Sequence, residues 1–322
     1  MRRRDFIAGV GATGVSSLAA RAQQAKMPVI GLLNGATWEA YAGWTAAIRR
    51  GLQDAGFVEG RNLSMEVRAA DGQYERLPAL ADDLVRRQVA VIIVIGGPRA
   101  AFAAKAATST IPIVFAIGSD AVEIGLVKSL SRPEANVTGA SIASGPLAPK
   151  RLELILEVVP QATLIGFLDN QSPFELNNIA TAAQIKGRQL VPFGASTEQE
   201  IDAAFADMPR RRIDALVVGA DAFFITRQEQ IVSLAARHGL PTIYSYRRNV
   251  VAGGLMSYGV LVDDMYRQAG LYAGRILKGE TPAELPVMLP TRFELVINNR
   301  TAKTLGIEIP LSLLIRADEV IE

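Results

Sequence analysis

The 322-residue chain contains no cysteine, which excludes disulfides, thiolate metal sites, cysteine nucleophiles and a lipid-modified cysteine after a leader. It has a single histidine, His238, so the sequence offers little for the nucleophile–base pairs that hydrolases usually use. An excess of positive charge is also missing, because 34 Lys and Arg face 32 Asp and Glu, and no basic surface for nucleic acid is expected. No phosphate loop, nucleophile elbow or metal cluster is found in the sequence. We therefore expect no cofactor, no metal and no catalytic residues.

The first 22 residues have the pattern of an export signal. Arg3 and Arg4 precede Phe6, a short apolar run follows, and residues 20–22 (Ala-Arg-Ala) form a small-x-small cleavage site. The pattern predicts a twin-arginine signal peptide at 1–22 and a mature protein that is free in the periplasm and not lipid-anchored. A positively charged membrane anchor or a disordered tail is the alternative, although the run is too short to span a bilayer. The periplasm has no pool of ATP or NADH, which removes most enzyme hypotheses.

The rest of the chain alternates strand-like apolar runs with amphipathic helical stretches. A continuous β-branched run such as 89–95 is typical of a parallel strand that is covered on both faces. The order implies parallel sheets with helices on both sides. We predict strands at 28–33, 63–67, 89–95 and 113–116, and helices at 41–55, 77–87, 99–108, 123–130, 147–159, 174–186, 201–207 and 226–238.

The strand pattern then occurs a second time. Gly-Leu-Leu-Asn at 31–34 is echoed by Gly-Phe-Leu-Asp at 166–169, and Ile-Pro-Ile-Val-Phe at 111–115 by Leu-Pro-Thr-Ile-Tyr at 240–244. The repeat predicts an α/β fold of two Rossmann-like lobes joined by a hinge, with one large sheet as the alternative. We place the crossings at 137–142 and 255–257. The expected units are 27–143 plus 257–285 for the first lobe, and 144–256 plus 286–322 for the second.

Open parallel sheets bind ligands beyond the carboxyl ends of their strands, so two facing lobes predict a cleft that closes on a solute. In the first lobe, Asn34 and Gly35 end a strand, and Trp38 and Tyr41 follow as an aromatic wall. The alternative is that Trp38 only covers the lobe surface. Trp44 lies at helical spacing from Tyr41 and is expected in the core.

Glycines mark a second edge of the expected cleft. Gly96 and Gly97 join a strand to a helix, and free amides at Arg99 or Ala100 suit an anion. A plain tight turn is the alternative. We favour a binding loop because the same edge recurs at residues 219–221.

Acidic and polar residues follow other strand ends. Asp120 and Asp221 are expected at equivalent ends, one in each lobe, where each can accept a ligand ammonium or hydroxyl or simply cap a helix. Asp221 is the stronger candidate. His238 is expected to end a helix, where partial positive charge suits the dipole. The remaining candidates are polar residues in loops, with a solvated loop as the alternative: Asn170, Gln171, Ser172, Ser245 and Tyr246.

Several segments, in this order, resemble a known family. They are Gly-Phe-Val-Glu-Gly-Arg-Asn at 56–62, Ile-Pro-Ile-Val-Phe at 111–115 with Asp120, Gly-Leu-Val-Lys-Ser-Leu at 125–130, Asn-Val-Thr-Gly at 136–139 and Phe-Glu-Leu-Val-Ile-Asn at 293–298. The chain is similar to the periplasmic substrate-binding proteins of ABC transporters, in the group that includes the tryptophan and aromatic-amino-acid binders. The resemblance implies a type I periplasmic-binding fold and a small-solute ligand. Ala121 and Gly97 stand where many relatives have proline and a hydroxyl residue.

We therefore expect a monomeric solute-binding protein of an ABC importer, and not an enzyme. It would capture a small carboxylate-bearing solute, amino-acid-like or aromatic, between its lobes and deliver it to a permease in the inner membrane. A ligand-sensing module for a membrane receptor is one alternative. An exported enzyme that uses only the carboxylates of Asp120 and Asp221 is another.

Overall fold

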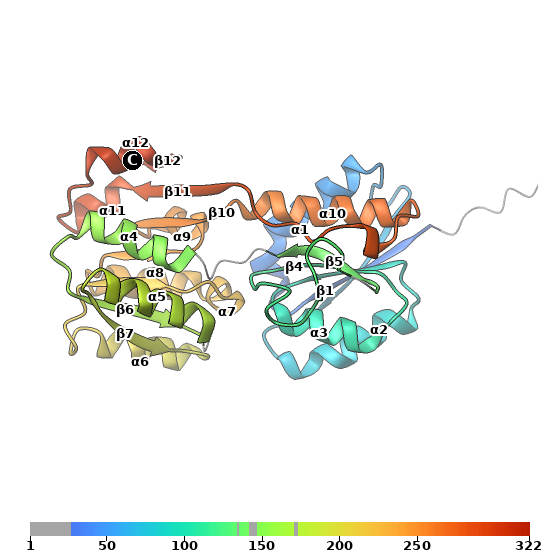
Figure 1. Cartoon of the computed structure of the whole chain (residues 1–322), viewed down its shortest axis with the longest axis horizontal. Helices are drawn as coiled ribbons and strands as arrows, with labels where there is room; N and C mark the ends of the chain where they lie inside the picture. Colours follow the sequence, from blue (N-terminus) through green and yellow to red (C-terminus); the bar gives the residue numbers. More distant parts are fainter. Residues whose placement is uncertain (1–26, 134, 142–146, 171–172) are drawn as a thin grey trace, which may run out of the picture.

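The computed structural model describes residues 27–133, 135–141, 147–170 and 173–322. The expected signal peptide, the candidate residues Gln171 and Ser172, and residue 142 of the first expected crossing lie outside these ranges. Two α/β lobes lie side by side along the long axis of the molecule (Figure 1). The predicted two-lobe α/β architecture is confirmed. Within the described ranges, no helix has the length and apolar character that a membrane crossing requires.

The first lobe is built on a five-stranded parallel sheet in the order β2-β1-β3-β4-β5. All five residues of β3 are buried, and alternate ones point into different cores: Ile93 toward one face and Ile92 toward the other. One face is covered by α1 (Trp38–Asp54) and α10 (Val262–Leu277), and the other by α2 (Leu77–Arg86) and α3 (Pro98–Ala107). The strands are β1 (Val29–Asn34), β2 (Ser64–Ala69), β3 (Val91–Ile95), β4 (Ile113–Ile117) and β5 (Val137–Ser141).

The second lobe has seven strands in the order β12-β11-β10-β9-β8-β6-β7, and only the β10–β11 pair is antiparallel. Helices α4, α5, α11 and α12 cover one face, and α6, α7 and α8 the other. The strands are β6 (Leu164–Asp169), β7 (Gln189–Gly194), β8 (Ala215–Val218), β9 (Thr242–Tyr244), β10 (Met256–Val260), β11 (Phe293–Asn298) and β12 (Glu319–Ile321). The helices are α4 (Ala148–Val158), α5 (Pro173–Ile185), α6 (Glu198–Asp207), α7 (Ala222–Thr226), α8 (Gln228–Arg237), α9 (Arg247–Val251), α11 (Asn299–Thr304) and α12 (Leu311–Arg316).

The internal repeat is visible in the strand orders. The order β2-β1-β3-β4-β5 in the first lobe matches β7-β6-β8-β9-β10 in the second. The end of β8, where Asp221 lies, is therefore equivalent to the end of β3, where Gly97 lies. Asp120 follows β4, whose equivalent is β9. The expectation that Asp120 and Asp221 occupy equivalent strand ends is wrong, because the two residues follow different strands of the repeat.

The chain crosses between the lobes at points that differ from those expected. Strand β10 pairs with β9 and β11 inside the second sheet, so the crossing follows Val260 and does not lie at 255–257. Residues 286–288 still belong to the first lobe, since Met288 N donates to Gly139 O at 2.9 Å and Ser141 N donates to Met288 O at 2.9 Å. The chain returns to the second lobe only before Phe293, where β11 begins.

The helix predicted at 123–130 is absent, and the segment forms turns. Leu126 N and Val127 N both donate to Ala121 O, at 2.9 and 3.0 Å, in place of successive i to i−4 bonds. Gly125 has a left-handed φ of 72°, which a continuing helix does not allow. The amphipathic pattern predicted a helix here, and the backbone forms a series of turns instead.

Candidate ligand-binding cleft

The carboxyl ends of the two sheets meet between the lobes. Ile225 of α7 is buried within the core cluster of the first lobe, and Tyr246, at the start of α9, packs against the same cluster. Both residues come from the second lobe and follow strand ends. The cleft that the sequence predicts is therefore the place where loops after β1, β2 and β3 face loops after β6, β8 and β9.

Asn34 and the glycines at this edge form a tight structural joint. Asn34 is fully buried; its Nδ2 donates to Thr37 O at 3.1 Å, and its Oδ1 accepts from Ala36 N at 3.0 Å. A Cβ on Gly35 would lie 2.4 Å from Gly96 O. Packing and hydrogen bonds within the first lobe therefore explain why asparagine stands at 34 and glycine at 35 and 96, independently of any ligand.

Gly97 occupies the N-cap position of α3 with φ 104°, and no side chain caps the helix. Pro98 follows at the first helical position, so the next amides face outward without intrahelical partners. The guanidinium of Arg99 lies over the ring of Tyr74, with Cζ 4.6 Å from the centroid. The sequence pointed to the amide of Arg99, whereas the structure adds its side chain and Tyr74, which follows β2.

Three other candidates make their contacts within their own lobes. Asp120 Oδ1 accepts from Val122 N at 2.8 Å and Glu123 N at 3.1 Å, which closes a turn. Ser245 Oγ is buried and donates to Val218 O at 3.1 Å. Trp38 is partly buried against the core of its own lobe, beneath Arg49, which favours the surface-covering alternative.

Asp221 and Asn170 are brought together, as the candidate site requires. Asp221 Oδ1 accepts from Phe223 N at 2.7 Å and from Asn170 Nδ2 at 2.8 Å. Asp221 is thus the N-cap residue of α7, the structural role weighed for it. Burial raises the pKa of Asp221, while the hydrogen bonds from Asn170 and Phe223 and the charge of Arg99 oppose the shift. A cationic ligand group beside this partly buried carboxylate would stabilise its ionised form.

The charge of Asp221 acts on three tyrosines. Burial is the main cause that raises the pKa of Tyr41, Tyr74 and Tyr246, and the negative charge of Asp221 adds to it in each case. Tyr41 and Tyr74 belong to the first lobe, so the field of Asp221 acts across the cleft. We call the following set the cleft cluster: Tyr41, Tyr74 and Arg99 from the first lobe, and Asn170, Asp221 and Tyr246 from the second.

A second group of aromatic residues joins the lobes beside this cluster. Trp44 stacks on Tyr266 with centroids 5.3 Å apart and lies 6.0 Å from Tyr246. The guanidinium of Arg248, from the second lobe, lies 5.4 Å from the Trp44 ring. The expectation that Trp44 is buried in the core is confirmed. Its interlobe contact with Arg248 was not predicted, because two residues so far apart in the chain give no sequence signal.

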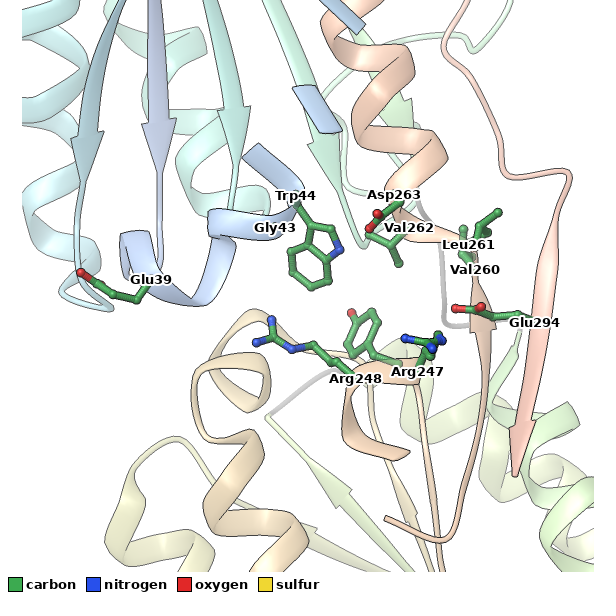
Figure 2. Close-up of a pocket in the computed structure, with 11 residues that line it drawn as sticks. Glu39, Gly43, Trp44, Arg247, Arg248, Val260, Leu261, Val262, Asp263 and Glu294 are labelled. Carbon is green, nitrogen blue, oxygen red and sulfur yellow. The ribbon is translucent and has the colours of Figure 1, made fainter. Parts of the chain in front are cut away.

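Figure 2 shows the pocket that borders these contacts, with Trp44 of the first lobe above Arg247 and Arg248 of the second. Its volume is about 470 Å³. The pocket is lined by the two arginines, by three carboxylates and by the β10–α10 crossing at 260–262. The carboxylates belong to Glu39, Asp263 and Glu294. Its walls come from both lobes, so its shape depends on their relative position. Across the described ranges, no group of three His, Asp or Glu residues is arranged to hold a metal ion.

Comparisons with known proteins agree on one family. A family model described as "ABC transporter substrate binding protein" matches residues 36–321. The Tyrosine-binding protein of Clostridioides difficile (strain R20291) is 29% identical over 263 residues, which are 80% of this chain and 75% of that protein.

Solved structures match over nearly the whole chain. A conserved domain protein from Vibrio cholerae has a TM-score of 0.84 at 28% identity, covering 92% of this chain and 100% of that one. An ABC domain in complex with L-Trp from Streptococcus pneumonia has a TM-score of 0.83 at 26% identity, covering 91% and 99%. The ligand-free, open structure of a substrate binding protein from Clostridium difficile has the same identity and coverages, 26%, 91% and 99%, but a TM-score of 0.65. The overall structure of this chain is therefore more similar to that of the L-Trp complex than to that of the open, ligand-free protein.

Proposed function

The chain belongs to the ABC transporter substrate binding protein family, and we propose that it captures an amino acid with an aromatic or large apolar side chain between its lobes. The observation that carries this proposal is the cleft cluster. Its members include one carboxylate, Asp221 of the second lobe, one guanidinium, Arg99 of the first, and three phenol groups whose pKa values the charge of Asp221 raises further. Groups of both charge signs on opposite lobes suit a zwitterion.

Each end of an amino acid has a partner in this arrangement. Asp221 would accept hydrogen bonds from the ammonium group. Burial destabilises the negative charge of this carboxylate, and a cationic group beside it would offset that cost. The carboxylate would be received by the amides of the first turn of α3 after Gly97, with Arg99 beside them. Tyr74 and Tyr246 would flank the side chain of the ligand, since aromatic faces bury apolar area and stack on rings.

The relatives support the same ligand class. One is named for tyrosine and another was solved with L-Trp. The greater likeness to the L-Trp complex than to the open, ligand-free structure supports closure of the lobes around a ligand. Small-angle scattering with and without a tight ligand tests closure: we expect a smaller radius of gyration on binding, and superimposable curves contradict the hinge.

The setting follows from the family, whose members work outside the cytoplasmic membrane. We propose export by the twin-arginine route through residues 1–22, a monomer that is free in the periplasm, and delivery of the solute to an inner-membrane permease. Permease and ATPase genes beside this one would support transport. A histidine kinase gene in their place would support the sensing alternative.

Calorimetry on a ligand panel tests the proposed ligand class. The panel contains aromatic, branched and small amino acids, aromatic acids without an amino group, and neutral sugars. We expect aromatic amino acids to bind best, and the aromatic acids to bind more weakly because they leave Asp221 without its partner. Binding of sugars alone contradicts the proposal.

A further inference from the structure

A buried ion pair lies in the second lobe beneath the cleft cluster. Arg151, near the start of α4, and Glu175, in the first turn of α5, pair through Nη2 and Oε1. Their side chains are 0% and 5% exposed. Neither residue is among the groups assigned above to the ligand, so the proposed function does not use this pair.

Glu175 holds the backbone that precedes Asp221. Its Oε2 accepts from Ala220 N at 3.1 Å. Gly219 has little room for a side chain, since a Cβ there would lie 3.2 Å from the same Oε2 and 3.1 Å from Leu168 O. The carboxylate therefore sets the position of the loop from which Asp221 enters the cleft.

Arg151 connects the same pair to the interlobe crossing that follows β10. Its Nη1 lies 3.5 Å from Tyr258 O on β10. Strand β10 ends at Val260, where the chain crosses to the first lobe. A chain of contacts thus runs from this strand through Arg151 and Glu175 to the Asp221 loop.

A buried ion pair of this kind is expected to contribute little to the stability of the fold. Two charges removed from water lose much of their solvation, and apolar replacements of similar volume are often as stable. Arg151 Nε is also buried without a hydrogen-bond partner among the described residues. We propose that Glu175 and Arg151 are positioning residues, which couple an ammonium group held at Asp221 to the interlobe crossing that follows β10. The proposal rests on the proposed function.

The charges around Glu175 give the coupling a measurable sign. Facing it are Arg151 from α4, Asp169 at the end of β6, Asp221 after β8 and Tyr246 at the start of α9. Burial raises the pKa of Glu175 to about 7; Arg151 opposes the shift, and Asp169 and Asp221 add to it. An ammonium at Asp221 favours ionised Glu175 and lowers this pKa, so binding releases a proton and affinity falls as the pH drops below 7.

Titration of the parent protein at pH 6 and pH 8 tests the sign. The dissociation constant for the best amino acid of the panel should be about threefold to tenfold higher at pH 6, since one pKa unit corresponds to tenfold. The amino group of a free amino acid does not titrate in this range. Calorimetry at pH 7 in buffers of different ionisation enthalpy should show release of a fraction of a proton.

The Glu175→Gln variant separates positioning from packing. Its amide oxygen can still accept from Ala220, but it mimics only the protonated carboxyl group. We expect it to bind at both pH values no more tightly than the parent does at pH 6, without proton release. Glu284→Gln is the matched control, because Glu284 also accepts backbone and hydroxyl hydrogen bonds, from Thr281 in the first lobe, and should leave the pH slope unchanged.

A second variant guards against misfolding of Glu175→Gln. Arg151→Met combined with Glu175→Leu removes both charges at similar volume, and should fold and bind without the pH slope. An unchanged slope in either variant overturns the positioning role while the proposed function stands. A parent protein that binds no amino acid at any pH contradicts the proposed function and the coupling together.

Discussion

Gly35 and Gly96 pack backbone to backbone where β1 and β3 end. A Cβ on Gly35 would lie 2.4 Å from Gly96 O, and a Cβ on Gly96 would lie 2.3 Å from Asn34 Oδ1. Gly96 also has a left-handed φ of 76°. This joint holds the loops after β1 and β3 at a fixed separation, so it sets the first-lobe wall of the cleft.

Gly96→Ala should lower the free energy of unfolding more than Gly125→Ala. Both residues have left-handed φ values, 76° and 72°, which disfavour alanine by about 1–2 kcal/mol. A Cβ on Gly125 meets open space, whereas one on Gly96 meets Asn34 Oδ1 and Gly35 N. We expect a loss for Gly96→Ala at least about twice that for Gly125→Ala, measured by denaturant unfolding. Equal losses would contradict the joint.

The sequence predicted the architecture well because buried parallel strands carry a strong signal. Residues 89–95 read as a strand that is covered on both faces, and β3 is buried throughout. Boundaries were less predictable. Residues 257–260 of strand β10 and the segment 286–288 were assigned to the wrong lobes, because the residue types near Ser257 and Met288 do not indicate which sheet these segments join.

The site was predictable in part, for a related reason. Strand ends could be located from the sequence, and the candidates chosen there include Asn170, Asp221 and Tyr246. In the structure Asn170 donates to Asp221, and Tyr246 packs against the first lobe. Tyr74 was missed because it does not directly follow a strand: β2 ends at Ala69, and a turn lies between them. Arg248 was missed because its partner Trp44 belongs to the other lobe.

Asp221→Asn should weaken binding of amino acids by a factor of about one hundred, because the ammonium group of the ligand loses its negatively charged acceptor. Asparagine is also a good N-cap residue, so α7 should keep its start. Since burial raises the pKa of Asp221, its ionised form lowers stability at neutral pH, and the neutral variant should be no less stable. Calorimetry and thermal unfolding measure the two effects.

Asp214→Asn is the matched control for that change. Asp214 Oδ2 accepts from Thr163 N at 2.7 Å and Leu164 N at 2.9 Å, at the sheet edge opposite the cleft. This variant should lower stability without altering affinity. If Asp221→Asn binds amino acids as tightly as the parent, the assignment of the ammonium site is wrong.

Arg248→Gln should raise the dissociation constant about twofold to fivefold, as expected for loss of a cation–π contact worth about 0.5–1 kcal/mol. The guanidinium lies over Trp44 only when the lobes are together, so its loss disfavours the closed form. Arg316→Gln is the control, because Arg316 does not line the interlobe pocket and pairs with Glu157 inside the second lobe, at 2.6 Å. Equal effects of the two variants on affinity would contradict an interlobe role for Arg248.

Export should depend on the arginine pair that precedes Phe6. The combined change Arg3→Lys and Arg4→Lys keeps the positive charge and the apolar run, so only a route that reads the arginines themselves is blocked. We expect full-length precursor to remain in the cytoplasm, whereas the parent is found in the periplasm with its N-terminus near Gln23. Arg2→Lys, which leaves the pair intact, should be exported normally. An unchanged periplasmic yield of the double variant would point to the general secretion route, because that route requires positive charge but not paired arginines.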